Sequence, residues 1–486
     1  MNIAIAINSE KKGFLCSVGE LLESKYGYKV SYIARDKNVE KIIMDNLGSN
    51  KKIVRLDEIK KVVKINNDNI IKEAELLESK YNVLFSSLLA MNRGLGQGYF
   101  FNVKNVPHIR KSMWSYVEKI RELVINYKAY ESILKKLDVV IVTDISPIIK
   151  SICSKNKCHN FAFSQTRFGD RYMWSSDSYM TSKELRDEID KLVVQGYNIA
   201  NDKKISYQSD AGGVLNLSKS KVSLTRVIIR IYGVFINEIK KMLLGNFPKN
   251  GYKPFAWIPN IFISWRNHRY LNNVSIHPLD IKNGRVVYMT LHIEPEISLF
   301  RYSPEFSNVY EAIVWISKSL PAGVTLVVKE HPISLAVRSI HFYKFLLKMP
   351  NVKLAHIDSL SLDWIKLSTF VSTITGSVGT EAVFYKKPVL SFGKHQLINH
   401  LPSVEYASNY DETKSAVKNL LEVDNNILDI SISCLYESIL QFSVDLPEFK
   451  KCNKGVKLEP NMSSIACDKL VSTYPLIFKQ DLFGLS

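Results

Sequence analysis

FVSTITGSVGTE, residues 370–381, contains a buried strand, a glycine-containing turn and the start of a helix. Residues 370–374 are mostly apolar or β-branched, as in a strand covered on both faces. Gly376 and Gly379 let the backbone approach a ligand closely, and the first amides of a helix over 378–385 would attract a phosphate. The spacing is neither that of a P-loop nor that of the dinucleotide-binding Gly-x-Gly-x-x-Gly. An ordinary strand-to-helix turn is therefore an equally good interpretation of this stretch alone.

Strands and helices alternate on both sides of this stretch. The predicted strands of the second half are 286–290, 324–328, 352–355, 370–374 and 389–392, and the helices between them are 306–320, 336–348, 360–368 and 378–385. Five alternations predict a doubly wound parallel sheet. The first half shows a similar pattern, with strands at 3–7, 29–34, 139–143 and 160–163. The chain is therefore predicted to be an α/β protein with two domains.

A basic, aromatic segment separates the two halves. Between Ser218 and Tyr270, ten Lys or Arg residues oppose a single Glu, so this segment holds +9 of the chain's net charge of +18. Such a segment favours an anionic partner: lipid headgroups, nucleic acid or a polyanionic glycan. A helix is predicted over 223–244, and residues 248–265, rich in Pro and aromatic residues, are predicted to be a linker or docking loop. The helix has a basic face, made of Arg226, Arg230, Asn237 and Lys241, and a wide apolar face.

Polar residues of the second half gather directly after its predicted strands, where open parallel sheets bind ligands. They are His292, Glu294 and Glu296 after the first strand, Lys329, Glu330, His331 and Pro332 after the second, and Thr375, Gly376 and Ser377 after the fourth. Scattered surface residues would not all follow strands at one edge, so the pattern predicts a binding site.

The chemistry of these residues indicates their roles. Lys329 and His331 could stabilise negative charge that develops on a leaving phosphate, although a surface loop of mixed charge is an alternative. The hydroxyl of Ser377 could add a donor, and the Glu381 carboxylate, one turn into the helix, could accept hydrogen bonds from ribose hydroxyls. Glu296 could bind sugar hydroxyls or act as a base.

One carboxylate of the first half completes the candidates. Asp144 follows the predicted strand 139–143, and a base for an acceptor hydroxyl is best placed on a domain opposite the donor. A helix N-cap is the more ordinary role for an Asp in this position.

The composition is that of a large globular chain: 486 residues, 46% hydrophobic and 23% charged. Its six cysteines are too sparse for a disulfide framework, and Cys153 and Cys158 lack the second ligand pair of a zinc site. Buried free thiols in a reducing cytoplasm are expected. No signal peptide and no run of about 18 apolar residues is found, so we expect a protein that does not cross a membrane.

Four elements between Val286 and Asn399 together resemble the capsule polysaccharide biosynthesis family of bacterial glycosyltransferases. In order, they are Pro295-Glu296, Val328-Lys329-Glu330-His331-Pro332, Thr375-Gly376-Ser377-Val378-Gly379-Thr380-Glu381-Ala382 and Lys387-Pro388-Val389-Leu390-Ser391-Phe392-Gly393. A vaguer similarity covers residues 93–99 and 164–171. The sequence departs from the family at His292-Ile293-Glu294, where related sequences often carry Gln, and residues 218–270 have no counterpart.

The resemblance implies a GT-B fold, in which two Rossmann-like domains face a cleft and the donor binds mostly to the C-terminal domain. It implies transfer of a sugar from a nucleotide-activated donor, with a CMP-sugar favoured, to a bacterial surface polysaccharide or lipid-linked glycan such as capsule or lipopolysaccharide. His331 with Pro332, and Ser377 with Glu381, would contact the nucleotide, and neither a metal nor a cofactor would be needed.

Four segments are expected on this basis. They are an acceptor-side Rossmann-like domain at 1–217, a basic helical insert at 218–284, a nucleotide-sugar-binding domain at 285–410 and helices packing back on the domains at 411–486. We expect a cytoplasmic enzyme whose basic segment could rest on the anionic inner membrane leaflet. The alternative is that the apolar face of the 223–244 helix packs into the core.

Two other functions are compatible with the sequence. One is polyol-phosphate transfer from a CDP-glycerol-type donor, which shares a two-domain layout and a CMP-releasing donor. The other is a non-catalytic polyanion or nucleic-acid binder that uses residues 218–270. The sequence contains no recognisable nucleic-acid-binding motif, so nucleic acid is not an expected partner.

Overall fold

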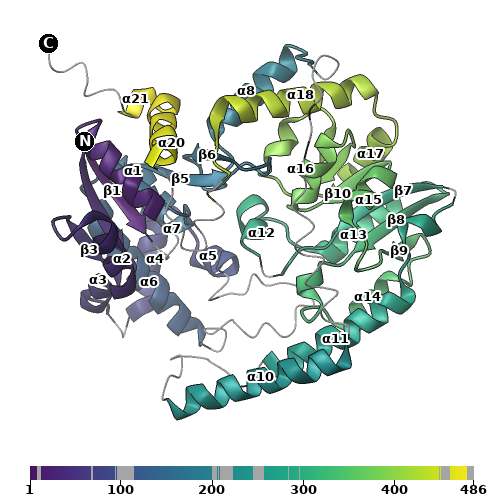
Figure 1. Cartoon of the computed structure of the whole chain (residues 1–486), viewed down its shortest axis with the longest axis horizontal. Coiled ribbons are helices and arrows are strands. Elements are labelled where there is room, and N and C mark those ends of the chain that lie inside the picture. Colours follow the sequence, from purple (N-terminus) through teal and green to yellow (C-terminus); the bar gives the residue numbers. More distant parts are fainter. Residues whose placement is uncertain are drawn as a thin grey trace. The chain divides into compact units, whose positions relative to one another are not determined.

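Two β-sheets organise the chain, which we describe from a computed structural model (Figure 1). The structure describes residues 1–7, 13–66, 69–92, 95, 114–199, 205, 207, 223–244, 255, 257–282, 284–294, 296–447, 449 and 460–478. Each sheet belongs to its own unit. The first unit takes residues 1–88, 115–189 and 436–486, and the second takes residues 89–114 and 190–435.

The first unit contains a seven-stranded sheet with the order β13-β6-β5-β4-β1-β2-β3. Its strands are β1 (Asn2–Ile7), β2 (Lys29–Ala34), β3 (Ile53–Arg55), β4 (Val139–Val142), β5 (His159–Gln165), β6 (Arg171–Ser175) and β13 (Ser443–Asp445). Strands β1 to β5 run parallel, whereas β6 and β13 pair antiparallel at one edge. The five consecutive residues 3–7 are buried because β1 lies inside the sheet with both faces covered.

Helices of the first unit connect and cover these strands. They are α1 (Gly13–Ser24), α2 (Lys37–Leu47), α3 (Leu56–Val62), α4 (Ile70–Tyr81), α5 (Phe85–Met91), α6 (Tyr116–Leu134), α7 (Pro147–Asn156), α20 (Pro460–Thr473) and α21 (Pro475–Phe478), while α8 (Lys183–Val194) and α5 continue into the second unit. The C-terminal helices complete this core: Trp174 Nε1 donates to the Ala466 carbonyl at 2.8 Å, and Leu470 and Phe478 are fully buried.

The second unit contains a six-stranded, all-parallel sheet with the order β12-β11-β10-β7-β8-β9. Its strands are β7 (Arg285–Thr290), β8 (Val324–Lys329), β9 (Val352–Leu354), β10 (Phe370–Thr373), β11 (Val389–Ser391) and β12 (Val404–Tyr406). Numbered from its own first strand, this order is 3-2-1-4-5-6, that of a Rossmann fold. The order reverses between β7 and β10. The predicted α/β class with two Rossmann-like domains is confirmed.

Helices of the second unit alternate with its strands. They are α12 (Ile297–Tyr302), α13 (Val309–Ser319), η4 (Pro332–Ser334), α14 (Ile340–Leu346), α15 (Ser361–Leu367), α16 (Ser377–Phe384), η5 (Leu397–His400), α17 (Tyr410–Leu420) and α18 (Asn425–Phe442), which continues into the first unit. Two long helices precede the sheet, α10 (Leu224–Leu243) and α11 (Trp257–Val274), and the short η3 (Pro278–Asp280) leads into it.

The prediction of a linker at 248–265 is wrong for its described part, because residues 257–274 form the regular helix α11. Pro259 misled the interpretation. It lies in the first turn of α11, where an amide N–H has no acceptor within the helix, so proline costs no hydrogen bond there. Core packing of the predicted 223–244 helix is also wrong: within α10 only Val227 and Glu238 are buried.

The C-terminal stretch 411–486 is predicted to form helices that pack back on the domains. Its residues up to 435 belong to the second unit, whereas the following residues belong to the first unit and also supply strand β13, which the sequence analysis does not predict. Arg171 holds this short strand in place, because its Nε donates to Ser443 Oγ at 2.8 Å. Residues 93–99, over which the vaguer family similarity extends, lie outside the described residues, apart from Leu95.

Candidate functional site

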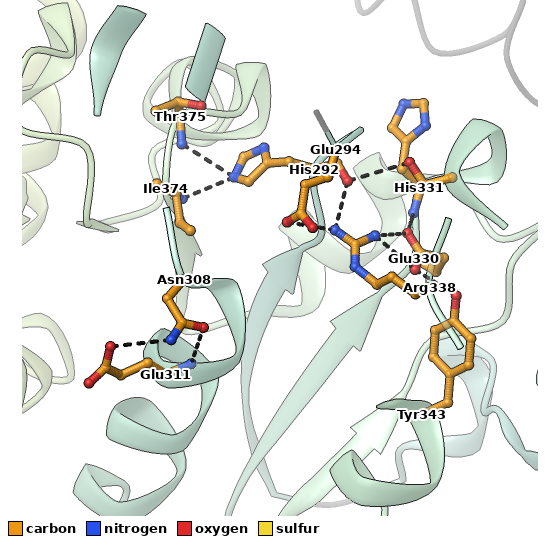
Figure 2. A network of polar contacts seen from close by, with 11 residues as sticks. His292, Glu294, Asn308, Glu311, Glu330, His331, Arg338, Tyr343, Ile374 and Thr375 are labelled. Carbon is orange, nitrogen blue, oxygen red and sulfur yellow. Dashed lines mark hydrogen bonds and ion pairs between the residues drawn. The ribbon is translucent and has the colours of Figure 1, made fainter. Parts of the chain in front are cut away.

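His292 joins the ends of two neighbouring strands of the second sheet (Figure 2). It follows β7, and its ring Nε2 accepts hydrogen bonds from the backbone N–H groups of Ile374 and Thr375, at 3.2 and 3.3 Å, just beyond β10. Because Nε2 accepts both bonds, the neutral ring carries its proton on Nδ1. The side chain is buried. This contact therefore fixes the geometry between β7 and β10, where the strand order reverses and open sheets bind ligands.

The turn after β10 leaves no room for a side chain at Gly376. The Gly376 amide donates to Thr373 Oγ1 at 2.8 Å. A Cβ at position 376 would lie 2.8 Å from that same oxygen and 3.1 Å from Cε1 of His292. Glycine is required here for close packing of the turn against His292, which is a stronger constraint than backbone flexibility alone.

Helix α16 starts immediately after this turn. Gly376 is its N-cap residue, no side chain caps its first amides, and no acidic residue lies in its first turn. Ser377 is exposed, and its hydroxyl donates to Oε1 of Glu381 at 3.1 Å. A helix start with this electrostatic character favours an anion. The Ser377–Glu381 pair shows that these two predicted residues lie together.

A buried ion cluster lies beside His292, between the segments that follow β7 and β8. Arg338 Nη2 lies 2.8 Å from Glu294 Oε1, and Arg338 Nη1 donates to both oxygens of Glu330, at 2.8 and 3.0 Å. Glu330 also accepts the hydroxyl of Tyr343 at 2.7 Å. All four side chains are at most 3% exposed. Figure 2 shows the guanidinium between the two carboxylates.

Burial and pairing compete in this cluster. Burial raises the pKa of Glu294, against the opposing effect of Arg338. Burial alone would lower the pKa of Arg338, but Glu294 and Glu330 raise it overall. Burial, followed by the charge of Glu330, raises the pKa of Tyr343 well above its usual value. The structure therefore keeps Arg338 charged and Tyr343 protonated, as donors to Glu330.

The cluster is connected to both sides of the sheet edge. Arg338 Nη2 also donates to the His292 carbonyl at 2.9 Å. On the other side, Asn267 of α11, which is fully buried, donates to the carbonyls of Leu335 and Arg338, at 2.7 and 2.9 Å. A continuous network thus runs from the end of β10 through His292 and Arg338 to helix α11.

Lys329, the last residue of β8, is buried. Burial lowers the pKa of its amine to about 8, although Asp358 and Asp363 act in the other direction. No described side chain accepts a hydrogen bond from this amine. A buried cation with this balance would gain from a bound anion.

The other predicted residues lie around this network. The His331 amide donates to Glu330 Oε1 at 2.6 Å, while His331 Nδ1 accepts the Ile333 amide at 3.2 Å, so the half-exposed ring caps η4. Pro332 is the buried first residue of η4. Glu296 is half-buried and immediately precedes α12.

Asp144 belongs to the first unit, where it is half-buried after β4. The N-cap of α7 is Ser146, whose Oγ accepts the Ile149 amide at 3.3 Å, so the prediction of Asp144 as a helix cap is wrong. The strand order β3-β2-β1-β4-β5 reverses between β1 and β4, so Asp144 follows a strand at the reversal point of its own sheet.

The second sheet brings together the residues predicted after β7, β8 and β10. Sequence reasoning missed Arg338, Tyr343 and Asn267, which hold those residues in place. Arg338 was assigned to a helix over 336–348, where an Arg normally faces solvent, whereas α14 begins only at Ile340. The sequence did contain one signal for a buried Arg. Glu294 and Glu330 follow neighbouring strands, and two acids buried at a sheet edge need a basic partner.

No protein-family model matches the sequence, and no curated protein matches it by sequence. Similar solved structures include the β-Kdo 2,7-transferase KpsC from Thermosulfurimonas dismutans, with 12% identity, a TM-score of 0.32 and coverage of 71% of this chain and 88% of that chain. The glycosyltransferase VinC in complex with dTDP has 9% identity, a TM-score of 0.27 and coverage of 94% and 100%. A UDP-GlcNAc 2-epimerase from Methanocaldococcus jannaschii has 13% identity, a TM-score of 0.26 and coverage of 87% and 94%. At such values, the function of this chain has to be argued from its own residues.

Arg338→Met is expected to destabilise the second unit strongly. It leaves two buried carboxylates without their cation, which typically costs about 3–5 kcal/mol. The triple change Glu294→Gln, Glu330→Gln and Arg338→Met removes all three charges and should recover much of that loss. Arg285→Met, at an exposed position, is the matched control and should stay within about 0.5 kcal/mol. Urea denaturation measures all three; a single variant as stable as the wild type would contradict the importance of the cluster.

Lys329→Met is expected to stabilise the protein at pH 7. The folded-state pKa of about 8 lies below the ordinary value of 10.5, so the charged amine opposes folding at low pH. The gain is at most about 3 kcal/mol below pH 8 and shrinks as the pH rises towards 10.5. Thermal unfolding at a series of pH values measures it. Lys344→Met, on the exposed side of α14, is the control. A gain that is constant across this pH range would contradict the assignment.

Proposed function

We propose that this chain is a glycosyltransferase of the GT-B type that binds a nucleotide-activated sugar at the carboxyl edge of its second sheet. The observation that carries the proposal is the assembly at the reversal between β7 and β10. There a glycine-requiring turn, the uncapped start of α16 and the Ser377–Glu381 pair lie beside the His292–Arg338 network. Nucleotide phosphates fit such a helix start, and a carboxylate one turn later suits ribose hydroxyls.

The donor-side roles follow from this placement. The turn formed by Thr375 and Gly376 presents the amides of Ser377 and Val378, which bind the phosphate together with the hydroxyl of Ser377. Gly379 keeps α16 close to β10. Glu381 accepts hydrogen bonds from the ribose. Lys329 and His331 stabilise the leaving phosphate, and Glu330 and Pro332 fix the backbone that presents His331. Glu296, at the start of α12, binds sugar hydroxyls.

The proposed reaction breaks the bond between the anomeric carbon of the sugar and its phosphate oxygen. An acceptor hydroxyl forms the new bond to that carbon, and its proton passes to a carboxylate, for which we propose Asp144. The nucleotide leaves with the bonding electron pair, and its negative charge is stabilised by the start of α16 with Lys329 and His331. Cationic side chains and helix amides supply this stabilisation, so the proposal includes no metal or cofactor. We propose a CMP-sugar as donor and a surface polysaccharide or lipid-linked glycan as acceptor.

Glu381→Ala is expected to weaken nucleotide binding about 10- to 150-fold, the value of a hydrogen bond to a charged group. His331→Ala should reduce transfer more than binding, because it acts on the leaving phosphate. Isothermal titration with CMP, UDP, GDP and CDP measures binding, and product release from CMP-sugars, UDP-sugars and CDP-glycerol measures transfer. Glu422→Ala, at an exposed position after α17, is the control.

The outcomes separate the donor from the site. Binding of CMP that Glu381→Ala abolishes supports a CMP-sugar enzyme, whereas turnover of CDP-glycerol alone would replace sugar transfer with polyol-phosphate transfer. Normal turnover by both variants contradicts the site. No response to any nucleotide contradicts the proposed function.

A further inference from the structure

Helix α10 exposes most of its apolar side chains. Ile229 is 63% exposed, Tyr232 is 65% exposed and Leu243 is 82% exposed, and they belong to a larger set. The other exposed apolar side chains of α10 and the residue after it are Leu224, Ile228, Phe235, Met242 and Leu244. Soluble proteins rarely expose so many large apolar residues side by side, and a surface of this kind marks an interaction site.

The side chains of α10 are ordered around its axis. Val227 and Glu238 are buried and mark the inner side. At 100° per residue, the exposed apolar residues of α10 lie within an arc of roughly 140° around the helix axis, next to that inner side. Leu224 and Ile229 are at the two ends of the arc. Arg226, Arg230 and Lys240 are exposed and occupy the remaining side. This arrangement is typical of a helix that lies in a membrane interface.

Helix α11 packs against α10, and the two ribbons adjoin in Figure 1. Its exposed side chains are likewise apolar and basic. Phe235 of α10 stacks on Phe255, just before α11, with ring centroids 5.4 Å apart. Trp257 and Phe262 of α11 are about half exposed, and Arg266 and Arg269 are exposed. We name the two helices, residues 224–243 and 257–274, the hairpin.

The described surface of the hairpin is basic. Across residues 223–244 and 257–274 the sequence has six Lys or Arg and one acid, Glu238. The Glu238 side chain is only 5% exposed, and its Oε1 lies 2.8 Å from Lys241 Nζ. Two copies meeting through this surface would bring like charges together, which opposes self-association. A surface with negative charges above an apolar layer complements both the basic and the exposed apolar side chains of the hairpin.

The hairpin is firmly attached to the candidate site. Asn267 of α11 bonds to the backbone of the segment that carries Arg338. Anything bound to the hairpin is therefore attached to the same rigid network that orders the ends of β7 and β8.

We propose that the hairpin docks on an anionic lipid surface. The apolar residues of α10 enter the boundary between headgroups and acyl chains, and the basic residues contact the headgroups. In this proposal the two helices lie along the surface. Among the described residues, no helix is long and apolar enough to cross a membrane.

Sedimentation of the full chain with lipid vesicles tests the proposal without any donor or acceptor, so its result does not depend on the proposed function. We expect binding to vesicles that contain phosphatidylglycerol and at least tenfold weaker binding to pure phosphatidylcholine. Ile229→Ser with Leu243→Ser should reduce binding at least tenfold, because each serine loses about 1.5–3 kcal/mol of apolar transfer when buried. Arg226→Gln with Arg230→Gln should reduce binding roughly 30-fold at about 1 kcal/mol per charge.

Val194→Ser with Leu279→Ser is the matched control, since these side chains are 87% and 90% exposed but lie outside the hairpin. This control should bind vesicles like the wild type. Equal binding to both kinds of vesicle, or unchanged binding by the Ile229 and Leu243 variant, overturns the proposal. Light scattering that finds a dimer in the wild type and a monomer in that variant also overturns it, because a second copy would then cover the surface.

Discussion

The guanidinium of Arg338 is the constraint on which the candidate site depends. It is buried between two carboxylates, and the segments that carry these three groups follow β7, β8 and η4. Removing a charge from such a group leaves another without compensation, so these segments cannot change independently of one another. The catalytic candidates His331 and Glu296 lie in the same segments. The ion cluster therefore determines where His331 and Glu296 lie, although no residue of the cluster is proposed to contact a substrate.

His292 extends this order across the sheet. Backbone amides beyond β10 would normally find acceptors in a loop or in water, and here an imidazole nitrogen from the neighbouring strand accepts them. The close approach of that ring explains why Gly376 has no side chain. The start of α16 is consequently held by contacts on the protein side, which leaves its first amides available to a ligand. Preorganisation of this kind is what electrostatic catalysis requires.

The sequence predicted the central strands of both sheets, but it missed β3, β6, β12 and β13 at the sheet edges and the residues that support the site. Strands such as β1 and β4 are continuous apolar runs, and burial on both faces imposes that composition directly. The residues after strands were predicted as a group because parallel strands end at one edge. Arg338 and Asn267 were missed because each also depends on a partner more than 40 residues away along the chain, and local periodicity carries no information about such partners. Helix α11 was missed for the opposite reason: a local signal, Pro259, received too much weight.

The division of the chain has a consequence for how the protein is made. The first unit is interrupted by almost the whole of the second, and its sheet receives β13 and the covering helix α20 only from the last part of the chain. During synthesis the second sheet can therefore be complete while β6 is still an unpaired edge with Trp174 uncovered. Exposed strand edges invite pairing with other chains. During synthesis, the first unit therefore starts to fold before the second but completes its sheet after it. While its sheet edge is exposed, the nascent chain is most prone to aggregate and most dependent on chaperones.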